Sequence, residues 1–339
     1  MTLATPTLAP SLPTAVGPLS AAVLDTITGR PSRRGLYRID APLGDSDPYG
    51  LDLQLALHVC YELHYRGFDG VDTRWEWNPA LLHLRAALED RFEEALVREV
   101  GEIGPDETAA AEMAALSIEP VDGQGLSYHL RDEGTWEQML EYFVHRSIYH
   151  LKEADPHAWL IPRLTGHAKA AFVAVEFDEY GAGHGDRLHQ RLFCDLLGAA
   201  HLDDGYLAYL DHVPAESLTV VNLMSMFGLH RGWRGAAVGH FASTEITSPP
   251  GSHRLVQALQ RLGAPAACVR FYAEHVEADA VHEQVVRTDV VGDLLANEPQ
   301  LDRDVVFGIR ARDLVEERLA DHMTDSWAAG RSSLRRGLV

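Results

Sequence analysis

Apolar residues recur every three or four positions along most of the chain, and this period predicts helices. Residues 51–65 follow it, and so do residues 79–100, which come directly after an Asn78-Pro79 pair. That pair fits a helix N-cap followed by proline at the first helical position. Strand-like alternation is scarce and no heptad repeat is sustained. The pattern therefore predicts an all-α fold with short connections, not a sheet or a coiled coil.

Most of the expected helices lie after residue 130. Thr135 and Gln138 fit a capping box that starts a helix running to about Ala154. Residues 117–134 are rich in Gly, Pro and Asp and are expected to form a loop. The helical period returns over residues 167–180, 188–197, 203–212, 216–229, 230–246, 252–262, 265–287 and 304–326. We therefore expect an N-terminal arm and helical extension over residues 1–130, and a second domain over residues 131–335.

Composition narrows the classes of function. The chain carries 50 acidic and 29 basic side chains, and its formal charge of -21 disfavours binding to nucleic acid or to an anionic membrane. No apolar run is long enough for a transmembrane helix, and the proline-broken N-terminus lacks the basic start of a signal peptide. The three cysteines form no CxxC motif, which is typical of a reducing compartment, so we expect a cytoplasmic protein. The 18 histidines favour a metal site or a proton-transfer site.

The stretch FYAEHVEADAVHEQVV, residues 271–286, places titratable groups on what should be a buried helix face. His275, Asp279 and His282 stand at i, i+4 and i+7, so they share one face with the core residues Phe271 and Tyr272. Buried imidazoles and carboxylates are costly unless they are paired or bind a metal, and this ligand type suits iron or manganese. The alternative is a set of satisfied core polar residues or a partly solvated face.

One helix cannot close a metal site, so ligands from other segments are needed. Glu245 lies near the end of a Gly- and Ala-rich helix, where the helix dipole disfavours an acid; the alternative is a solvated last turn. Glu179 and His189 are ten residues apart, which places them about 80° apart on a regular helix. The glycines between them permit a kink or a π-bulge. His184 is an alternative ligand, but apolar neighbours favour His189.

The order of these candidates resembles the haem-oxygenase-like diiron oxidase and oxygenase superfamily. The amino-acid sequence is similar to those of its bacterial group called iron-containing redox enzymes over residues 153–183, 229–252 and 271–283. The resemblance as a whole covers about residues 135–330. It implies a seven-helix bundle of the haem oxygenase type that holds two irons. Two sets of three ligands would complete the sites, with Glu245 or Glu179 bridging: Glu179, Glu245 and His275 in one set, and His189, Asp279 and His282 in the other.

The resemblance also implies chemistry. Two Fe(II) ions would reduce O2 as co-substrate to a peroxo-diferric species, and an oxygenase would draw two electrons from an external, unidentified reductant. We expect N-oxygenation of a small amine-containing metabolite in specialised metabolism. The alternatives are oxidative C–C cleavage or desaturation of an amino acid or fatty acid, and a non-catalytic metal-binding scaffold. A haem oxygenase is disfavoured by the carboxylate cluster. Residues 1–130 match no motif; packing on the bundle, capping its pocket and forming a homodimer contact are all open.

Other residues are weaker candidates. Glu176, one turn before a candidate ligand, is a possible support for the site. Arg231 and Arg234 are candidates to bind a substrate carboxylate. His58 and Glu62 stand at i and i+4 but are interpreted as a polar pair, because nothing nearby in the sequence completes a site. Three aromatic residues are candidates for pocket lining, with ordinary core packing as the alternative: Tyr180, Trp233 and Tyr272.

Overall fold

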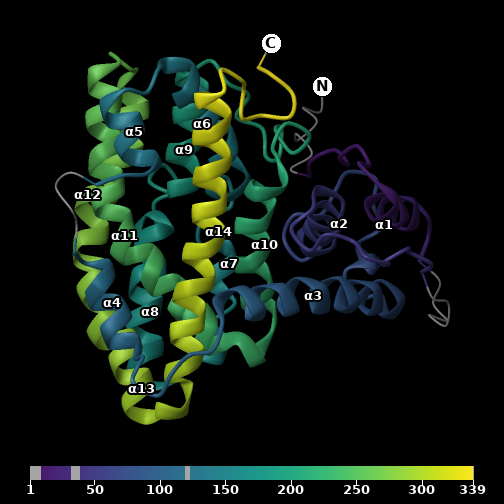
Figure 1. Ribbon diagram of the computed structural model, residues 1–339, viewed down its shortest axis with the longest axis horizontal. Coiled ribbons are helices and arrows are strands. Elements are labelled where there is room, and N and C mark those ends of the chain that lie inside the picture. Colours follow the sequence, from purple (N-terminus) through teal and green to yellow (C-terminus); the bar gives the residue numbers. More distant parts are fainter. Residues whose placement is uncertain (1–8, 32–38, 119–122, 339) are drawn as a thin grey trace.

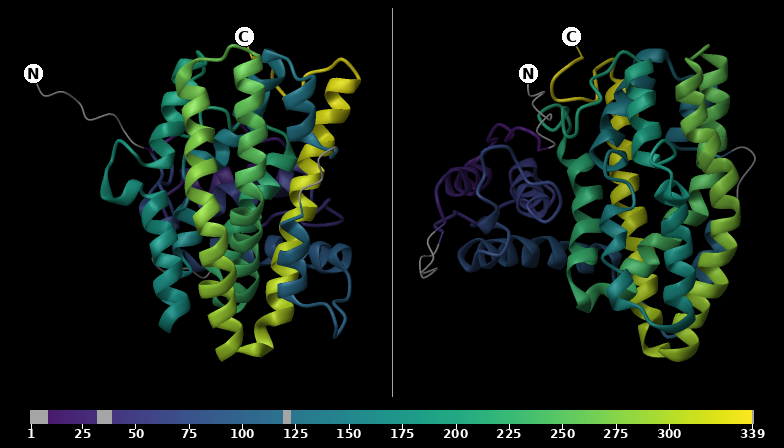
Figure 2. Two further views of the ribbon diagram at one scale, coloured as in Figure 1. Left: turned by 90° about the vertical axis from the view of Figure 1, so that its left-hand side faces the viewer. Right: turned by 180° about the vertical axis from the view of Figure 1, so that it is seen from behind.

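The computed structural model describes residues 9–31, 39–118 and 123–338, and within α12 the side chains of residues 277–280 fall outside the description. Across these ranges the regular structure is entirely helical. Three long helices form the body of a bundle, in which α11 (Arg234–Arg261) packs against both α12 (Ala266–Val285) and α14 (Asp302–Ala328) (Figures 1 and 2). The predicted all-α fold is confirmed.

Shorter helices complete the bundle. Thr135 and Gln138 form the predicted capping box: Gln138 N donates to Thr135 Oγ1 at 3.2 Å, and Thr135 N donates to Gln138 Oε1 at 3.0 Å. The helices of this part are α4 (Ala109–Leu116), α5 (Leu126–Asp132), α6 (Trp136–His150), α7 (Asp155–Ala158), α8 (Gly166–Glu179), α9 (His189–Ala199), α10 (Ala215–Leu229) and α13 (Asp293–Asn297). None of the described helices combines the length and the apolar character that crossing a bilayer requires.

The N-terminal helices α1 (Pro18–Thr28), α2 (Leu51–Glu62) and α3 (Pro79–Val100) lie beside the bundle, next to α10 (Figures 1 and 2). Their buried apolar residues join the same core cluster as those of the bundle. A buried polar contact crosses between the two parts, because Asn222 Nδ2 donates to the carbonyl of Gln54 at 2.8 Å. The division of the chain at residue 130 stays a prediction.

Three segments differ from the predicted helices. Residues 203–212 form successive turns, because His201 and Leu207 have positive φ angles of 60° and 58°. The loop predicted over residues 117–134 contains α5. The helices predicted before and after residue 250 are one helix, α11, which continues through Pro249 and Pro250. Proline in a helix interior is costly, but buried residues on both sides of the pair pack against α12 and α14 and keep the helix continuous.

Candidate metal centre

Four buried side chains from four segments meet inside the bundle. They are Glu153 in the turn after α6, Glu179 at the end of α8, His189 at the start of α9 and His275 in α12. One candidate ligand atom of each lies within 4.8 Å of the others. His189 Nδ1 lies 2.7 Å from Glu179 Oε2, and His275 Nε2 lies 3.6 Å from Glu153 Oε1. This first group offers two carboxylates and two imidazoles to one cation.

Glu179 also belongs to a second buried group. Its other members are Glu245 of α11 and His282 of α12, and the candidate ligand atoms again lie within 4.8 Å of one another. His282 Nδ1 lies 3.3 Å from Glu245 Oε2 and 3.9 Å from Glu179 Oε1. The two oxygens of Glu179 therefore face different groups, since its Oε2 approaches His189. A carboxylate in this position can bridge two cations.

His282 stands seven positions after His275, and this spacing separates the two groups along α12. Seven residues are nearly two helical turns, so both rings share a face but lie about 10 Å apart along the axis. Each ring therefore serves one group. This arrangement differs from the expected division, which put His275 with Glu245 and His189 with His282.

The helix breaks between Glu179 and His189. Residues 181–183 all have positive φ, at 68°, 51° and 82°, so α8 ends and α9 starts as a separate helix. The sequence predicts an interruption by glycines that permits a kink or a π-bulge. The interruption is confirmed as a kink between two helices, whereas a π-helical stretch of the chain lies at Val286–Gly292. Two facing helix ends, not one helix face, bring Glu179 and His189 together.

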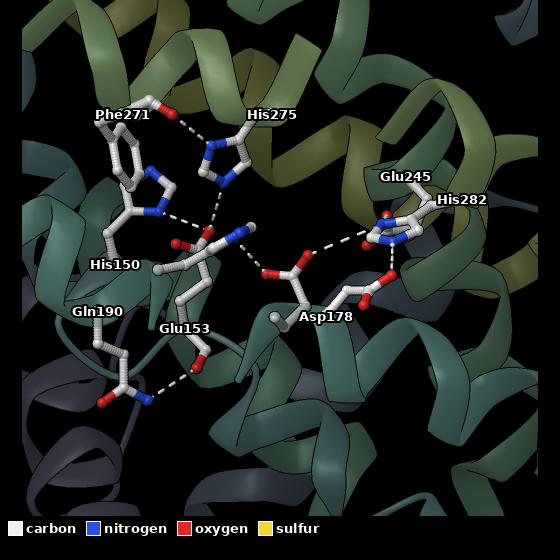
Figure 3. Close-up of polar contacts among 10 residues, drawn as sticks. His150, Glu153, Asp178, Gln190, Glu245, Phe271, His275 and His282 are labelled. Carbon is white, nitrogen blue, oxygen red and sulfur yellow. Dashed lines mark hydrogen bonds and ion pairs between the residues drawn. The ribbon is translucent and has the colours of Figure 1, made fainter. Parts of the chain in front are cut away.

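Hydrogen bonds outside the first group fix the direction of its side chains. The carbonyl of Phe271 accepts from His275 Nδ1 at 2.8 Å, which directs His275 Nε2 at Glu153 (Figure 3). His150 Nδ1 lies 2.7 Å from the same Oε1 atom of Glu153. A carbonyl that holds one ring nitrogen of a histidine selects the tautomer whose other nitrogen can bind a metal. The first group is thus oriented by neighbours that are not themselves candidate ligands.

Acidic side chains crowd the interior around both groups. Glu153, Glu176, Glu179 and Glu245 are buried and line one cavity, whose described lining residues include no lysine or arginine. Burial, and then the charges of Glu179 and Glu245, raise the pKa of Glu176 well above the usual range of a carboxyl group. Glu153 Oε2 is buried without a hydrogen-bond partner among the described residues. Metal ions would offset this buried negative charge, and the nitrogen and oxygen donors fit iron.

The remaining predicted residues near this region lie as follows. Glu176 lines the cavity, and both of its carboxyl oxygens lack a hydrogen-bond partner among the described residues. Tyr180 donates to Asp155 Oδ1 at 3.0 Å. His184 is exposed, which leaves His189 as the histidine of this segment in the first group. Asp279 lies outside the described side chains, and its role as a ligand stays a prediction.

Two of the aromatic pocket candidates pack elsewhere. Trp233 stacks on Phe307, with 5.4 Å between ring centroids. Tyr272 stacks on Phe143 at 6.3 Å. Neither is among the described residues that line the cavity. An aromatic residue at helical spacing is more often core than pocket, and these two follow that rule. The cavity has a different tyrosine, Tyr149, whose pKa is raised by burial and then by Glu153.

Glu153 is the member of these groups that the sequence interpretation misses. It lies in the turn after α6, so no helical periodicity marks it. The available signal is its place three residues after the partly buried His150, in the stretch YHLKEADPH. That stretch overlaps residues 153–183, the first of the segments quoted for the resemblance to the diiron superfamily. An acid in this position pairs with the preceding helix turn and faces the core.

The comparison with protein families agrees with this geometry. The family described as iron-containing redox enzymes matches residues 140–317, just over half of the chain. The matched range contains every member of both groups. No curated protein matches the chain.

Proposed function

The chain belongs to the family of iron-containing redox enzymes, and we propose that it is a diiron oxygenase that oxidises the nitrogen of a small amine-containing metabolite. The observation that carries the proposal is the pair of buried ligand groups joined by Glu179. When bound, two iron ions would supply the reduction of O2 and the oxidation of the substrate. The family and the helical bundle together place the chain in the haem-oxygenase-like fold class.

The ligand roles follow from the two groups. Glu153, His189 and His275 would hold one iron together with Glu179. The second iron would take Glu245, His282 and the other oxygen of Glu179, with the neighbouring Asp279 completing it as the sequence predicts. Both groups combine carboxylate and imidazole, which is the donor set that nonhaem iron prefers.

The cavity favours an amine over a carboxylate substrate. Glu176 lines this cavity but belongs to neither ligand group, and its carboxyl group, which has no hydrogen-bond partner among the described residues, offers an acceptor for a substrate N–H group. A fatty acid or amino acid that undergoes C–C cleavage needs a basic partner for its carboxylate. The candidates for that task lie elsewhere: Arg231 is exposed, and Arg234 pairs with Glu298, its Nη1 donating to Glu298 Oε1 at 2.9 Å. These positions support N-oxygenation.

The atoms of the proposed reaction balance with an external reductant. One oxygen atom of O2 forms a bond to the amine nitrogen, and the other leaves as water. The step consumes two electrons and two protons beyond those of the amine, so a separate electron donor is required. The buried side chains of Tyr149 and Phe241 line the cavity and restrict the access of bulk water to this reaction.

Iron binding and product mass test the proposal. We expect the wild-type chain, loaded anaerobically with Fe(II), to bind two ions, and His189→Ala and His282→Ala each to bind fewer. His184→Ala, which removes an exposed histidine from the same loop, is the matched control and should keep both ions. Loaded protein is then mixed with O2, a chemical reductant and a panel of small amines, amino acids and fatty acids.

The products separate the candidate functions. An amine that gains the mass of one oxygen atom, with oxygen uptake lost in His282→Ala, would support N-oxygenation. Loss of carbon dioxide or formation of an alkene would replace it with oxidative C–C cleavage. Iron binding with no substrate-dependent oxygen uptake across the panel would favour a metal-binding scaffold. Binding of a single ion by the wild type would contradict the diiron centre itself.

A further inference from the structure

We propose that the N-terminal segment of residues 51–66 positions the metal centre, with Arg66 as the positioning residue that connects the segment to Glu153 and His189. The inference rests on the metal centre proposed above, but residues 51–66 lie outside both ligand groups and outside the family match. It assigns a task to a part of the chain whose role the sequence leaves open.

The turn that carries Glu153 needs support from outside. Its next residue, Ala154, has a φ of 71°, a left-handed conformation that is strained for a residue with a Cβ atom. Neighbouring side chains in this turn point opposite ways. Glu153 faces the first ligand group, whereas Lys152 Nζ donates to Glu62 Oε2 at 2.9 Å. The N-terminal segment therefore holds the outer side of the turn whose inner side supplies a ligand.

Arg66 holds both ligand-bearing segments at once. Its Nη2 donates to the carbonyl of Leu151 at 2.9 Å and to Gln190 Oε1 at 2.9 Å. Gln190 in turn donates from Nε2 to the carbonyl of Glu153 at 2.9 Å. Because Gln190 directly follows His189, one guanidinium connects the backbone at two candidate ligands from different elements. Figure 3 shows the contact between Gln190 and Glu153 that lies inside this connection.

The guanidinium itself is held in place. It lies over the ring of Tyr206, with 4.0 Å to the ring centroid. The hydroxyl of Tyr206 donates to Glu62 Oε1 at 2.8 Å, and Glu62 and Lys152 are both 0% exposed. A planar donor that is stacked and bonded at two points loses little freedom on binding, which a lysine cannot reproduce. The connection from α2 to the turn is thus a partly buried, largely fixed network, in which Glu62 and Lys152 are fully buried.

The expected effect is on metal affinity. Ligands must be held within roughly 0.5 Å of their binding geometry, and changes to the groups that orient them typically cost about 10- to 100-fold in metal affinity. In Arg66→Met the Gln190 amide and the Leu151 carbonyl lose their shared donor, so Glu153 and His189 can move independently. We expect a 10- to 100-fold weaker site in the first ligand group, while the second group keeps its affinity.

Arg163→Met is the matched control. Arg163 also donates to two carbonyl oxygens, here the backbone carbonyls of Gly228 and Leu229, and it caps the end of α10. Neither of these partners is a candidate ligand or bonded to one. Both substitutions remove an arginine from two carbonyl partners. Both are therefore expected to lower stability by a similar amount, and Arg66→Met alone is expected to change metal binding.

The measurement is an anaerobic titration of the full-length chain with Co(II), followed by its visible absorption, with unfolding curves for each variant. Weaker binding and altered bands in Arg66→Met, with wild-type binding in Arg163→Met, would support the proposal. Gln190→Leu, which breaks the same connection at its other end, should reproduce the effect and serves if Arg66→Met does not fold. Wild-type affinity and bands in a folded Arg66→Met or Gln190→Leu would overturn the positioning role. No Co(II) binding by the wild type would instead refute the metal centre, and this inference with it.

Discussion

Gly239→Ala tests how closely α11 and α14 approach each other. A Cβ atom at Gly239 would lie 2.8 Å from the carbonyl carbon of Val305 in α14 and nearer still to its oxygen. Ordinary contact begins at about 3.4 Å, so the helices would have to separate by at least roughly 0.6 Å. The obstacle is backbone, which has no alternative rotamer. Ala236 and Gly308 repeat the same close contact one turn away. The separation would therefore weaken the packing along the whole interface between α11 and α14.

The size of the effect follows from two opposing terms. Overpacking a well-packed core typically costs 1–3 kcal/mol, and a rigid backbone obstacle places this case near about 3 kcal/mol. Replacing glycine by alanine inside a helix returns about 1 kcal/mol through helix propensity. The net expectation is a loss of about 2 kcal/mol in the free energy of unfolding. Gly251→Ala, in the same helix but with open space around its Cβ, should gain up to about 1 kcal/mol.

Urea unfolding followed by circular dichroism and tryptophan fluorescence measures both variants. We expect the two alanine substitutions in α11 to have opposite signs and to differ by about 3 kcal/mol, with unchanged dependence on urea concentration. If Gly239→Ala were as stable as Gly251→Ala to within about 0.5 kcal/mol, α11 and α14 could not lie in backbone contact. The reasoning about the close contact between α11 and α14 would then be refuted.

Three further substitutions test other features by the same unfolding measurement. Asn78→Ala removes the cap of α3 and should cost about 1 kcal/mol, whereas Asn78→Asp keeps an acceptor and should cost little. Lys152→Met leaves the buried Glu62 carboxylate without its cation and should cost roughly 3–5 kcal/mol, and adding Glu62→Gln should recover part of that loss; additive costs would contradict a coupled pair. Burial, and then His322, lower the pKa of His145 to about 3. The unfolded imidazole gains its proton near pH 6.5, so the stabilisation by neutral His145 is fully present above that pH and falls by about 1.4 kcal/mol per unit towards pH 3. His145→Gln should lessen the pH dependence of stability between pH 6 and 4 by this slope, and an unchanged slope would contradict a buried neutral ring.

The recurrence of apolar residues every three or four positions predicts most of the helices from the sequence alone. The cap at Asn78 and the capping box at Thr135 both form where they are predicted, because their hydrogen bonds are local. The errors occur where tertiary packing overrides local preference. Residues 203–212 have the composition of a helix but fold as turns, and Pro249-Pro250 has the composition of a break but lies inside one helix.

The residues of the candidate site differ in the same way: local helical geometry predicts some of them, and tertiary packing alone brings in the others. His275 and His282 are visible because one helix face displays both, and a regular helix fixes their spacing. Glu153 is not visible, because it lies in a turn and becomes a candidate ligand only through contact with a helix more than one hundred residues away. For a related reason, the sequence predicts the interruption between Glu179 and His189 but not how the two side chains meet. Positive φ angles over residues 181–183 change the chain direction, and helical geometry cannot anticipate that change.

Helix α10 explains why the N-terminal segment cannot be a loose appendage. All twelve residues from Ser217 to Gly228 are buried, so this helix is covered on every side, not along one stripe. Part of the cover is α2, which packs on α10 and supplies Glu62 to the buried Lys152. A fragment that begins at residue 131 would expose one side of α10 and free the turn at Glu153. The sequence of α10, which carries no charged residue after Glu216, therefore already requires a partner layer that the family match does not include.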